Sequence, residues 1–294
     1  MSAGSTIATP DAPRTATIIA LANQKGGVGK TTTAVNLSVI LARSGLRILL
    51  IDIDPQGNAT SSLGVDKSAL SATTYDVLVD RFPVQRAAIE TDRSRLSLVP
   101  STPMLAGAEV ELVNLAEREW RLAHALSPIT SNFDVILIDC PPSLGLLTVN
   151  ALTAARNVIV PIQCEFLALE GVGQLVTTID LVKRQLNPPL DIIGVLMTMY
   201  DVRTRLSANV VEEVRRFFPH RIFETVVPRS IRLAEAPSYG QSISEYDGQS
   251  RGALAYGEVA LELSRRLRLP MKSDSMNGSS SSVQPVANAM AVGP

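Results

Sequence analysis

Residues 23–32 read NQKGGVGKTT, and this glycine-rich stretch decides the fold of the chain. An apolar run at 17–22 precedes it and indicates a buried strand, while apolar residues spaced by three and four over 34–41 indicate a helix. In such a strand–turn–helix setting, backbone N–H groups can close around an anion at a helix N-terminus. The stretch therefore predicts a phosphate-binding loop, in which Lys30 reaches the β- and γ-phosphates and the Thr31 hydroxyl binds Mg²⁺.

One position departs from the general pattern G-x-x-x-x-G-K-[ST] of phosphate-binding loops. Gln24 stands where the first glycine is expected, and a second lysine, Lys25, follows it directly. Three glycines, two lysines and two threonines nevertheless fall within the eight residues 25–32. This density favours a nucleotide site over the alternative, a glycine-rich turn that binds nothing.

Composition and length bound the class of protein. The chain has 294 residues, 46% hydrophobic and 19% charged, which suits one large or two small soluble domains. Aromatic residues make up only 4%, which argues against a stacking surface for single-stranded nucleic acid. No apolar stretch approaches the ~18 residues that span a bilayer, and no signal peptide is recognisable, so we expect a cytoplasmic protein. Cys140 and Cys164 each end a predicted strand and are expected to fill space there.

Apolar runs alternate with helix-length periodic segments through most of the chain. Near-continuous apolar strands separated by helices predict an α/β fold, with a doubly wound, mostly parallel sheet and helices on both faces. The expected strands are 18–22, 48–53, 96–99, 135–138, 158–162, 192–197 and 222–227. We expect a single domain over 15–269, a disordered arm over 1–14 and a disordered tail over 270–294.

Functional side chains in such a sheet gather beyond the carboxyl ends of the strands. Asp139 follows an expected strand and precedes two prolines, which suits a Mg²⁺ ligand; capping of the next helix is the alternative. Asp52 and Asp54 lie two residues apart, so they should face one side of a strand, where a cation between them would relieve their repulsion. The plainer interpretation is that Asp54 starts a turn before Pro55.

Several stretches together identify a family. Residues 25–32 resemble the deviant Walker A motif of the ParA/MinD superfamily of P-loop ATPases. Further matches to ParA (Soj)-type partition ATPases are DIDPQGN at 52–58, DCPPS at 139–143, TMYD at 198–201, VPR at 227–229 and LAEAPS at 233–238. The resemblance covers about residues 15–268. It implies a P-loop NTPase fold of the deviant Walker A class, with ATP and Mg²⁺ as cofactors.

The resemblance also implies which residues hold the nucleotide and the metal. The implied phosphate contacts are Lys25, Gly26, Gly27, Val28, Gly29, Lys30, Thr31 and Thr32, and the implied adenine contacts are Met199, Pro228 and Arg229. The implied metal site comprises Thr31, Asp54 and Asp139, with Asp52 as a support nearby. Ser230 departs from the asparagine expected next to this adenine pocket in close relatives.

Two residues are candidates for catalysis. The resemblance places the hydrolytic role on Asp54, which would orient the attacking water. It also implies that Lys25 reaches across a homodimer to the partner's nucleotide and neutralises charge on the γ-phosphate, as an arginine finger does. The simpler interpretation of Lys25 is a solvated loop lysine.

Charge is unevenly distributed along the chain, although the overall net charge is only −1. Residues 181–240 have a local net charge of +3, and the remaining residues have a net charge of −4. A basic segment suits contact with DNA phosphates, but solvated helix faces look similar. The resemblance implies binding to nonspecific double-stranded DNA, and the candidate contacts are Arg203, Arg205, Arg215, Arg216 and Arg232.

The last predicted helix carries a stripe of apolar residues, which are Ala253, Tyr256, Ala260, Leu263 and Leu267. This stripe should dock on the body of the protein. Basic residues near its end make attachment to a membrane surface the alternative. The stripe lacks large aromatic anchors, so we expect no membrane partner.

The leading hypothesis is a ParA-type ATPase with weak intrinsic turnover. It would dimerise around ATP–Mg²⁺, bind nonspecific DNA on the nucleoid, and segregate chromosome or plasmid DNA with stimulation by a ParB/Spo0J-type centromere-binding protein. One alternative is a MinD-like regulator acting at a membrane. Another is an enzyme that couples ATP to small-molecule or electron-transfer chemistry, but a bridging cluster needs paired cysteines, and Cys140 and Cys164 end different strands.

Overall fold

Seven strands form one sheet in the order β3-β4-β2-β5-β1-β6-β7. The computed structural model describes residues 15–166 and 168–270, so the predicted arm at 1–14 and the predicted tail beyond 270 lie outside the described residues. The strands are β1 (Thr17–Leu21), β2 (Ile48–Asp52), β3 (Ile89–Glu90), β4 (Leu96–Val99), β5 (Val135–Asp139), β6 (Asn157–Gln163) and β7 (Asp191–Thr198). All pairings are parallel except that of β3 with β4.

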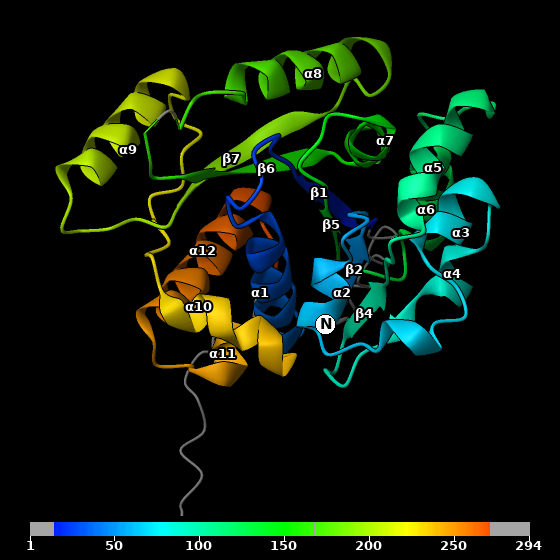
Figure 1. Ribbon diagram of the computed structural model, residues 1–294, viewed down its shortest axis with the longest axis horizontal. Coiled ribbons are helices and arrows are strands. Elements are labelled where there is room, and N and C mark those ends of the chain that lie inside the picture. The colour runs from blue at the N-terminus through cyan, green and yellow to red at the C-terminus, as the bar shows by residue number, and fades with distance from the viewer. Residues whose placement is uncertain (1–14, 167, 271–294) are drawn as a thin grey trace, which may run out of the picture.

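Helices connect the strands and cover the sheet (Figure 1). The α-helices are α1 (Lys30–Arg43), α2 (Asn58–Ser62), α3 (Thr74–Val79), α4 (Val84–Ala87), α5 (Leu105–Glu111), α6 (Arg121–Leu126), α7 (Leu146–Ala154), α8 (Val172–Gln185), α9 (Arg205–Phe217), α10 (Ile231–Glu235), α11 (Ile243–Tyr246) and α12 (Arg251–Leu267). The short 3₁₀ helices are η1 (Lys67–Ala69), η2 (Leu112–Asn114), η3 (Ser127–Ile129) and η4 (Ala236–Tyr239).

The central strands send alternate side chains into two separate cores. On β1, Ile19 and Leu21 pack in one core with residues of α1 and α12, whereas Ala20 packs in the other with residues of α7, α8 and α9. Figure 1 likewise shows α1 and α12 on one side of the sheet and α7, α8 and α9 on the other. The prediction of a doubly wound, mostly parallel sheet with helices on both faces is therefore confirmed.

One expected strand was wrong. Residues 222–227 run beside β7 but make only isolated bridges, at Ile222 and at Pro228. The N–H groups of Phe223 and Val227 donate to the Val195 and Met197 carbonyls of β7, both at 2.8 Å. Between them the N–H groups of Glu224 and Thr225 donate to the carboxylate of Glu262 on α12, at 3.1 and 3.4 Å, so no continuous ladder forms. The sequence analysis also missed β3, a strand of only two residues at the antiparallel edge.

The apolar stripe of α12 docks on the body, as predicted. Tyr256 is fully enclosed, and its hydroxyl lies 3.1 Å from the hydroxyl of Thr33 on α1. Ala253, Ala260 and Leu263 are buried beside it. Within residues 15–166 and 168–270, no helix is both long enough and apolar enough to cross a membrane.

Candidate functional site

The glycine-rich loop lies between the end of β1 and the start of α1, where the sequence places it. Gly27 and Gly29 have φ angles of 73° and 88°, in the left-handed region that side chains disfavour, so glycine is required at both positions. Gly29 is the N-cap of α1, and no side chain caps the helix. The backbone N–H groups of the first turn are therefore available to an anion.

Two side chains outside the core of the motif hold the loop in place. Asn23 donates through Nδ2 to the Pro161 carbonyl of β6 at 2.7 Å and accepts from the Lys25 N–H at 3.0 Å. On the other side of the loop, the Thr198 hydroxyl at the end of β7 donates to the Val28 carbonyl at 2.9 Å. The loop is thus fixed against the carboxyl ends of two strands.

The two lysines of the loop have different surroundings. Lys30 is buried, and its ammonium donates to the Lys25 carbonyl at 3.1 Å. Burial lowers the pKa of Lys30, and the nearby Asp139 carboxylate opposes that shift. The Lys25 side chain is 37% exposed and forms an ion pair with Glu165, which follows β6. Lys25 is therefore paired within its own chain and remains partly exposed to solvent.

Thr31 and Asp139 are brought together at the base of the loop. The Thr31 hydroxyl donates to Oδ2 of Asp139 at 2.7 Å, and Asp139 is fully buried at the end of β5. The other carboxylate oxygen, Oδ1, is buried and has no hydrogen-bond partner among the described residues. Burial raises the pKa of Asp139 well above its usual range, and the Asp52 carboxylate adds to this shift. A cation beside Oδ1 would satisfy that oxygen and favour the charged carboxylate.

Two alternatives for the acidic residues can be judged from the structure. Asp139 does not cap the next helix, because α7 begins at Leu146 and has Gly145 as its N-cap. Asp54 does start a turn, since the Gly57 N–H donates to its carbonyl at 2.8 Å and the Gln56 N–H donates to its Oδ1 at 2.9 Å. This turn leaves Oδ2 of Asp54 with no bond to the described residues.

The carboxylate of Asp52 is fully buried and hydrogen-bonded within the protein rather than open to a ligand. Asp52 ends β2 directly opposite Asp139 of β5. Asp54 lies two residues beyond the end of this strand rather than on it, and its N–H donates to Oδ1 of Asp52 at 3.2 Å. Oδ2 of Asp52 accepts from the backbone N–H and the hydroxyl of Thr60 on α2, at 2.8 and 2.7 Å. Burial raises the pKa of Asp52 to about 6, against the lowering effect of the Thr60 hydrogen bonds.

The three predicted adenine contacts lie on adjacent segments. A bridge between Tyr200 and Pro228 brings them together, and the Arg229 N–H donates to the Tyr200 carbonyl at 3.0 Å. Met199 immediately follows Thr198, the residue that fixes the loop, and adopts a left-handed φ of 52°. The segments are therefore next to the phosphate loop, although the expected strand before Pro228 is absent.

The five candidate DNA contacts differ in how free their charges are. Arg203 is paired with Asp201 at 2.7 Å, Arg215 with Glu212 at 2.7 Å, and Arg232 with Glu235 at 3.1 Å. Arg205 and Arg216 are exposed on α9 and have no such pair within the described residues. These two guanidinium groups are the most available to phosphate.

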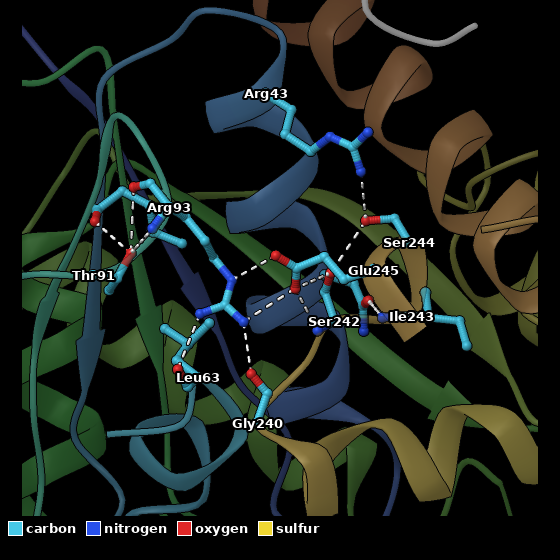
Figure 2. Close-up of polar contacts among 11 residues, drawn as sticks. Arg43, Leu63, Thr91, Arg93, Gly240, Ser242, Ile243, Ser244 and Glu245 are labelled. Atoms are coloured by element: carbon cyan, nitrogen blue, oxygen red, sulfur yellow. Dashed lines mark hydrogen bonds and ion pairs between the residues drawn. The ribbon is translucent and has the colours of Figure 1, made fainter. Parts of the chain in front are cut away.

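Figure 2 shows a clasp that the sequence did not predict, centred on Arg93. Its guanidinium donates to the Leu63 carbonyl after α2 at 3.0 Å and to the Gly240 carbonyl after η4 at 2.6 Å. It also pairs with Glu245 at 2.8 Å. Burial would raise the pKa of Glu245, but hydrogen bonds from Arg93 and Ser242 hold it below its usual range.

The clasp joins the segment after Asp54 to the segment that carries Arg232. The backbones of Gly64 and Gly240 meet so closely that a Cβ on Gly240 would lie 2.7 Å from the Cα of Gly64. Both glycines have positive φ angles, 79° and 64°. Only glycine at 240 permits this contact without movement of the backbone.

Sequence reasoning missed the residues that support the predicted ones. Glu165 could have been suspected, because it is an acidic residue just after the expected strand 158–162. Thr198 belongs to a quoted motif, but its hydrogen bond to the loop had no signal of its own. Arg93 had no signal either, since its partner Glu245 lies 152 residues away along the chain.

The parallel sheet, the glycine loop at the end of β1 and the buried acid at the end of β5 together define a P-loop nucleotide-binding protein. Residues 16–192 match the family model described as an AAA domain. The chain is 54% identical over 246 residues to the sporulation initiation inhibitor protein Soj of Bacillus subtilis, across 84% of this chain and 97% of that protein. It is 52% identical over 249 residues to the chromosome partitioning protein ParA of Myxococcus xanthus, across 85% of this chain and 88% of that protein. The chain belongs to the ParA/Soj family of chromosome-partitioning ATPases.

A solved structure is also similar. The protein from Mycobacterium smegmatis named cobyrinic acid a,c-diamide synthase, with a bound ATP analogue and magnesium, is 41% identical and has a TM-score of 0.77. The match covers 86% of this chain and 96% of that chain. The predicted resemblance to ParA/Soj-type ATPases is confirmed by the relatives, and the predicted fold class is consistent with this structure.

Proposed function

We propose that this chain is an ATP-dependent partition protein whose ATP-bound homodimer binds nonspecific double-stranded DNA. The observation that carries the proposal is the pairing of Thr31 with Asp139 beneath the phosphate loop. One hydroxyl and one unpartnered carboxylate oxygen suit Mg²⁺, which binds few protein ligands and keeps the rest of its shell for water and phosphate. The M. smegmatis structures, with ADP or an ATP analogue and magnesium, support ATP–Mg²⁺ as the ligand.

Each residue of the site has a role in this proposal. The N–H groups of the loop and the Lys30 ammonium bind the phosphates, Thr31 and Asp139 hold the metal with Asp54 nearby, and Met199, Pro228 and Arg229 surround the base. Bound Mg²⁺ supplies positive charge that neutralises the phosphates. Asp54 orients the attacking water through its free Oδ2.

Turnover by the isolated chain is slow in this proposal. Lys25 acts in trans on the nucleotide of the partner subunit, so catalysis needs a dimer. In the monomer Lys25 is paired instead with Glu165, a weak contact that must break when the dimer forms. A ParB/Spo0J-type protein bound at centromere sites raises the rate, and the names of the relatives in chromosome partitioning support such a partner.

DNA binding is assigned to the arginines on and next to α9 and α10. Arg205 and Arg216 make the main phosphate contacts, because neither forms an ion pair within the described residues. Arg203 just before α9, Arg215 on α9 and Arg232 on α10 add to them, and Figure 1 shows both helices at the same end of the molecule. The ATP-bound dimer would accordingly reside on the nucleoid in the cytoplasm. Its cargo is chromosome or plasmid DNA.

Two other functions have less support. A MinD-like membrane role would need a free apolar helix face, but the stripe of α12 is packed against the body. Small-molecule chemistry is suggested only by the name of the M. smegmatis protein. That protein is 41% identical to this chain, whereas the two partition relatives are 54% and 52% identical to it.

DNA binding as a function of nucleotide tests the proposal. A duplex of unrelated sequence is titrated with the full chain in the presence of ADP, ATP or a slowly hydrolysed ATP analogue, each with Mg²⁺. The proposal predicts binding with ATP and the analogue, and weak binding with ADP. Equal binding in all three states would contradict it, as would binding to anionic vesicles instead of DNA in the ATP state.

A further inference from the structure

A cavity of about 280 Å³ lies away from the phosphate loop, among α3, α4, α6 and η3. Figure 1 shows these helices at the end of the molecule opposite α9 and α10. Its walls are largely apolar and include Val77, Phe82, Val84 and Ala125. Small-ligand sites typically combine such walls with a few converging polar groups.

The most informative residue in the wall is Arg121. It is only 8% exposed, yet no carboxylate within the described residues lies within 4 Å of its guanidinium. Its Nε donates to the Ala116 carbonyl at 3.2 Å, and its Nη1 lies at the limit of hydrogen bonding, 3.5 Å from the Val79 carbonyl. A guanidinium has five N–H donors, so most of those on Arg121 are unused. Burial lowers the pKa of Arg121, the nearby Arg81 adds to this effect, and Glu117 opposes it. A buried guanidinium with few hydrogen bonds is costly, and an anion in the cavity would reduce that cost.

Two further nitrogen donors, Arg81 and His124, stand at the cavity wall with a single acid between them. Arg81 lies 3.4 Å and His124 lies 3.8 Å from the carboxylate of Glu117, which is itself half exposed. Arg86 of α4 is nearby and sits over the ring of Phe82 at 5.1 Å. Cationic groups therefore outnumber acidic groups around this apolar space.

We propose that this cavity binds a small organic anion, with a carboxylate or phosphate head on a flat apolar body. The head pairs with the guanidinium of Arg121, which suits planar, bidentate recognition, and accepts from the rim donors Arg81 and His124. The apolar body lies against Phe82 and Val84. The proposal does not depend on the nucleotide site or on DNA binding.

Phenylacetate is a simple probe of this site. Binding to the full chain is measured by titration with backbone NMR detection, next to the neutral phenylacetamide and inorganic phosphate. We expect saturable binding of phenylacetate at millimolar concentration, with shifts in α3 and α6. We expect binding at least about tenfold weaker for phenylacetamide, which cannot form the charge-assisted pair, and weaker binding of phosphate, which has no apolar body.

Substitutions of residues in the cavity wall test where the anion binds. Arg81→Ala with His124→Ala removes the two exposed rim donors and should weaken phenylacetate binding several-fold without unfolding the chain. Arg121→Lys keeps the positive charge but loses the parallel N–H donors of the guanidinium, so it should weaken phenylacetate binding further. Arg184→Ala, an exposed arginine on α8, is the matched control and should bind like wild type.

Three results would overturn the proposal. They are no saturable binding of phenylacetate, equal binding of phenylacetamide, and unchanged binding in both the rim variant and Arg121→Lys.

Discussion

The ammonium of Lys25 is paired with the carboxylate of Glu165 in the same chain. If Lys25 serves the nucleotide of a partner subunit, as we propose, this ion pair must break when the dimer forms. Both side chains are about one-third exposed, so solvent screens the pair and its free energy is about 0–1 kcal/mol. The pair is therefore a weak restraint on dimerisation rather than a lock.

Glu165→Gln should strengthen ATP-dependent dimerisation by up to about fivefold, because Lys25 then has no ion pair to break when the dimer forms. Sedimentation with ATP–Mg²⁺ at protein concentrations near the dissociation constant measures the effect. Glu170→Gln, an exposed acid in the same segment, should behave like wild type. Weaker dimerisation of Glu165→Gln would mean that Glu165 supports the dimer instead.

Arg93→Met should lower the free energy of unfolding by about 2–4 kcal/mol. The change leaves the Leu63 and Gly240 carbonyls without their donor and Glu245 without its cation. Urea unfolding measures the loss, and Arg156→Met, at an exposed arginine, should stay within about 0.5 kcal/mol of wild type. Adding Glu245→Gln to Arg93→Met should cost less than the sum of the single changes.

The raised pKa of Asp52, about 6 against a usual 3.8, predicts how stability depends on pH. Between these values the folded chain binds more protons than the unfolded chain, so the free energy of unfolding contributed by Asp52 falls as pH rises. The loss across this window is about 3 kcal/mol at most. Asp52→Asn, measured without nucleotide, should flatten the slope from about pH 4 to pH 6. An unchanged slope would show that Asp52 ionises normally.

Arg205→Ala combined with Arg216→Ala should weaken DNA binding for every sequence and lower the salt slope by about two units, one for each lost phosphate contact. Arg215→Ala should have a smaller effect, since Arg215 is already paired with Glu212. Filter binding at several salt concentrations measures both slopes. If the double variant bound DNA as tightly as wild type, α9 would not be part of the DNA interface.

The sequence predicted the parts of this protein that depend on local pattern. The apolar runs predicted the parallel strands. The rule that functional residues gather at the carboxyl ends of strands predicted that Asp139 lies near the phosphate loop, and the structure pairs it there with Thr31. At residues 222–227 the local pattern does not show that the backbone between the two contacts with β7 bonds to Glu262, a side chain on α12.

Long-range polar contacts had no signal in the sequence. Glu165 pairs with Lys25, and Arg93 joins Leu63 to Gly240, because the fold brings distant loops together. Such contacts involve ordinary charged residues whose partners are not set by periodicity or spacing. The buried position of Arg121 is a further case, since nothing in its neighbourhood in the sequence marks it as enclosed.

The central claim is that ATP assembles a dimer through Lys25 and that Asp54 acts only afterwards, in hydrolysis. Light scattering with ATP–Mg²⁺ on Asp54→Ala and Lys25→Ala tests it most directly. Asp54→Ala should accumulate as a dimer, because it binds ATP but lacks an oriented water. Lys25→Ala should bind ATP and remain a monomer, because facing triphosphates repel in a poorly solvated interface without those cations. A monomeric Asp54→Ala, or a Lys25→Ala that dimerises and hydrolyses ATP normally, would contradict the account.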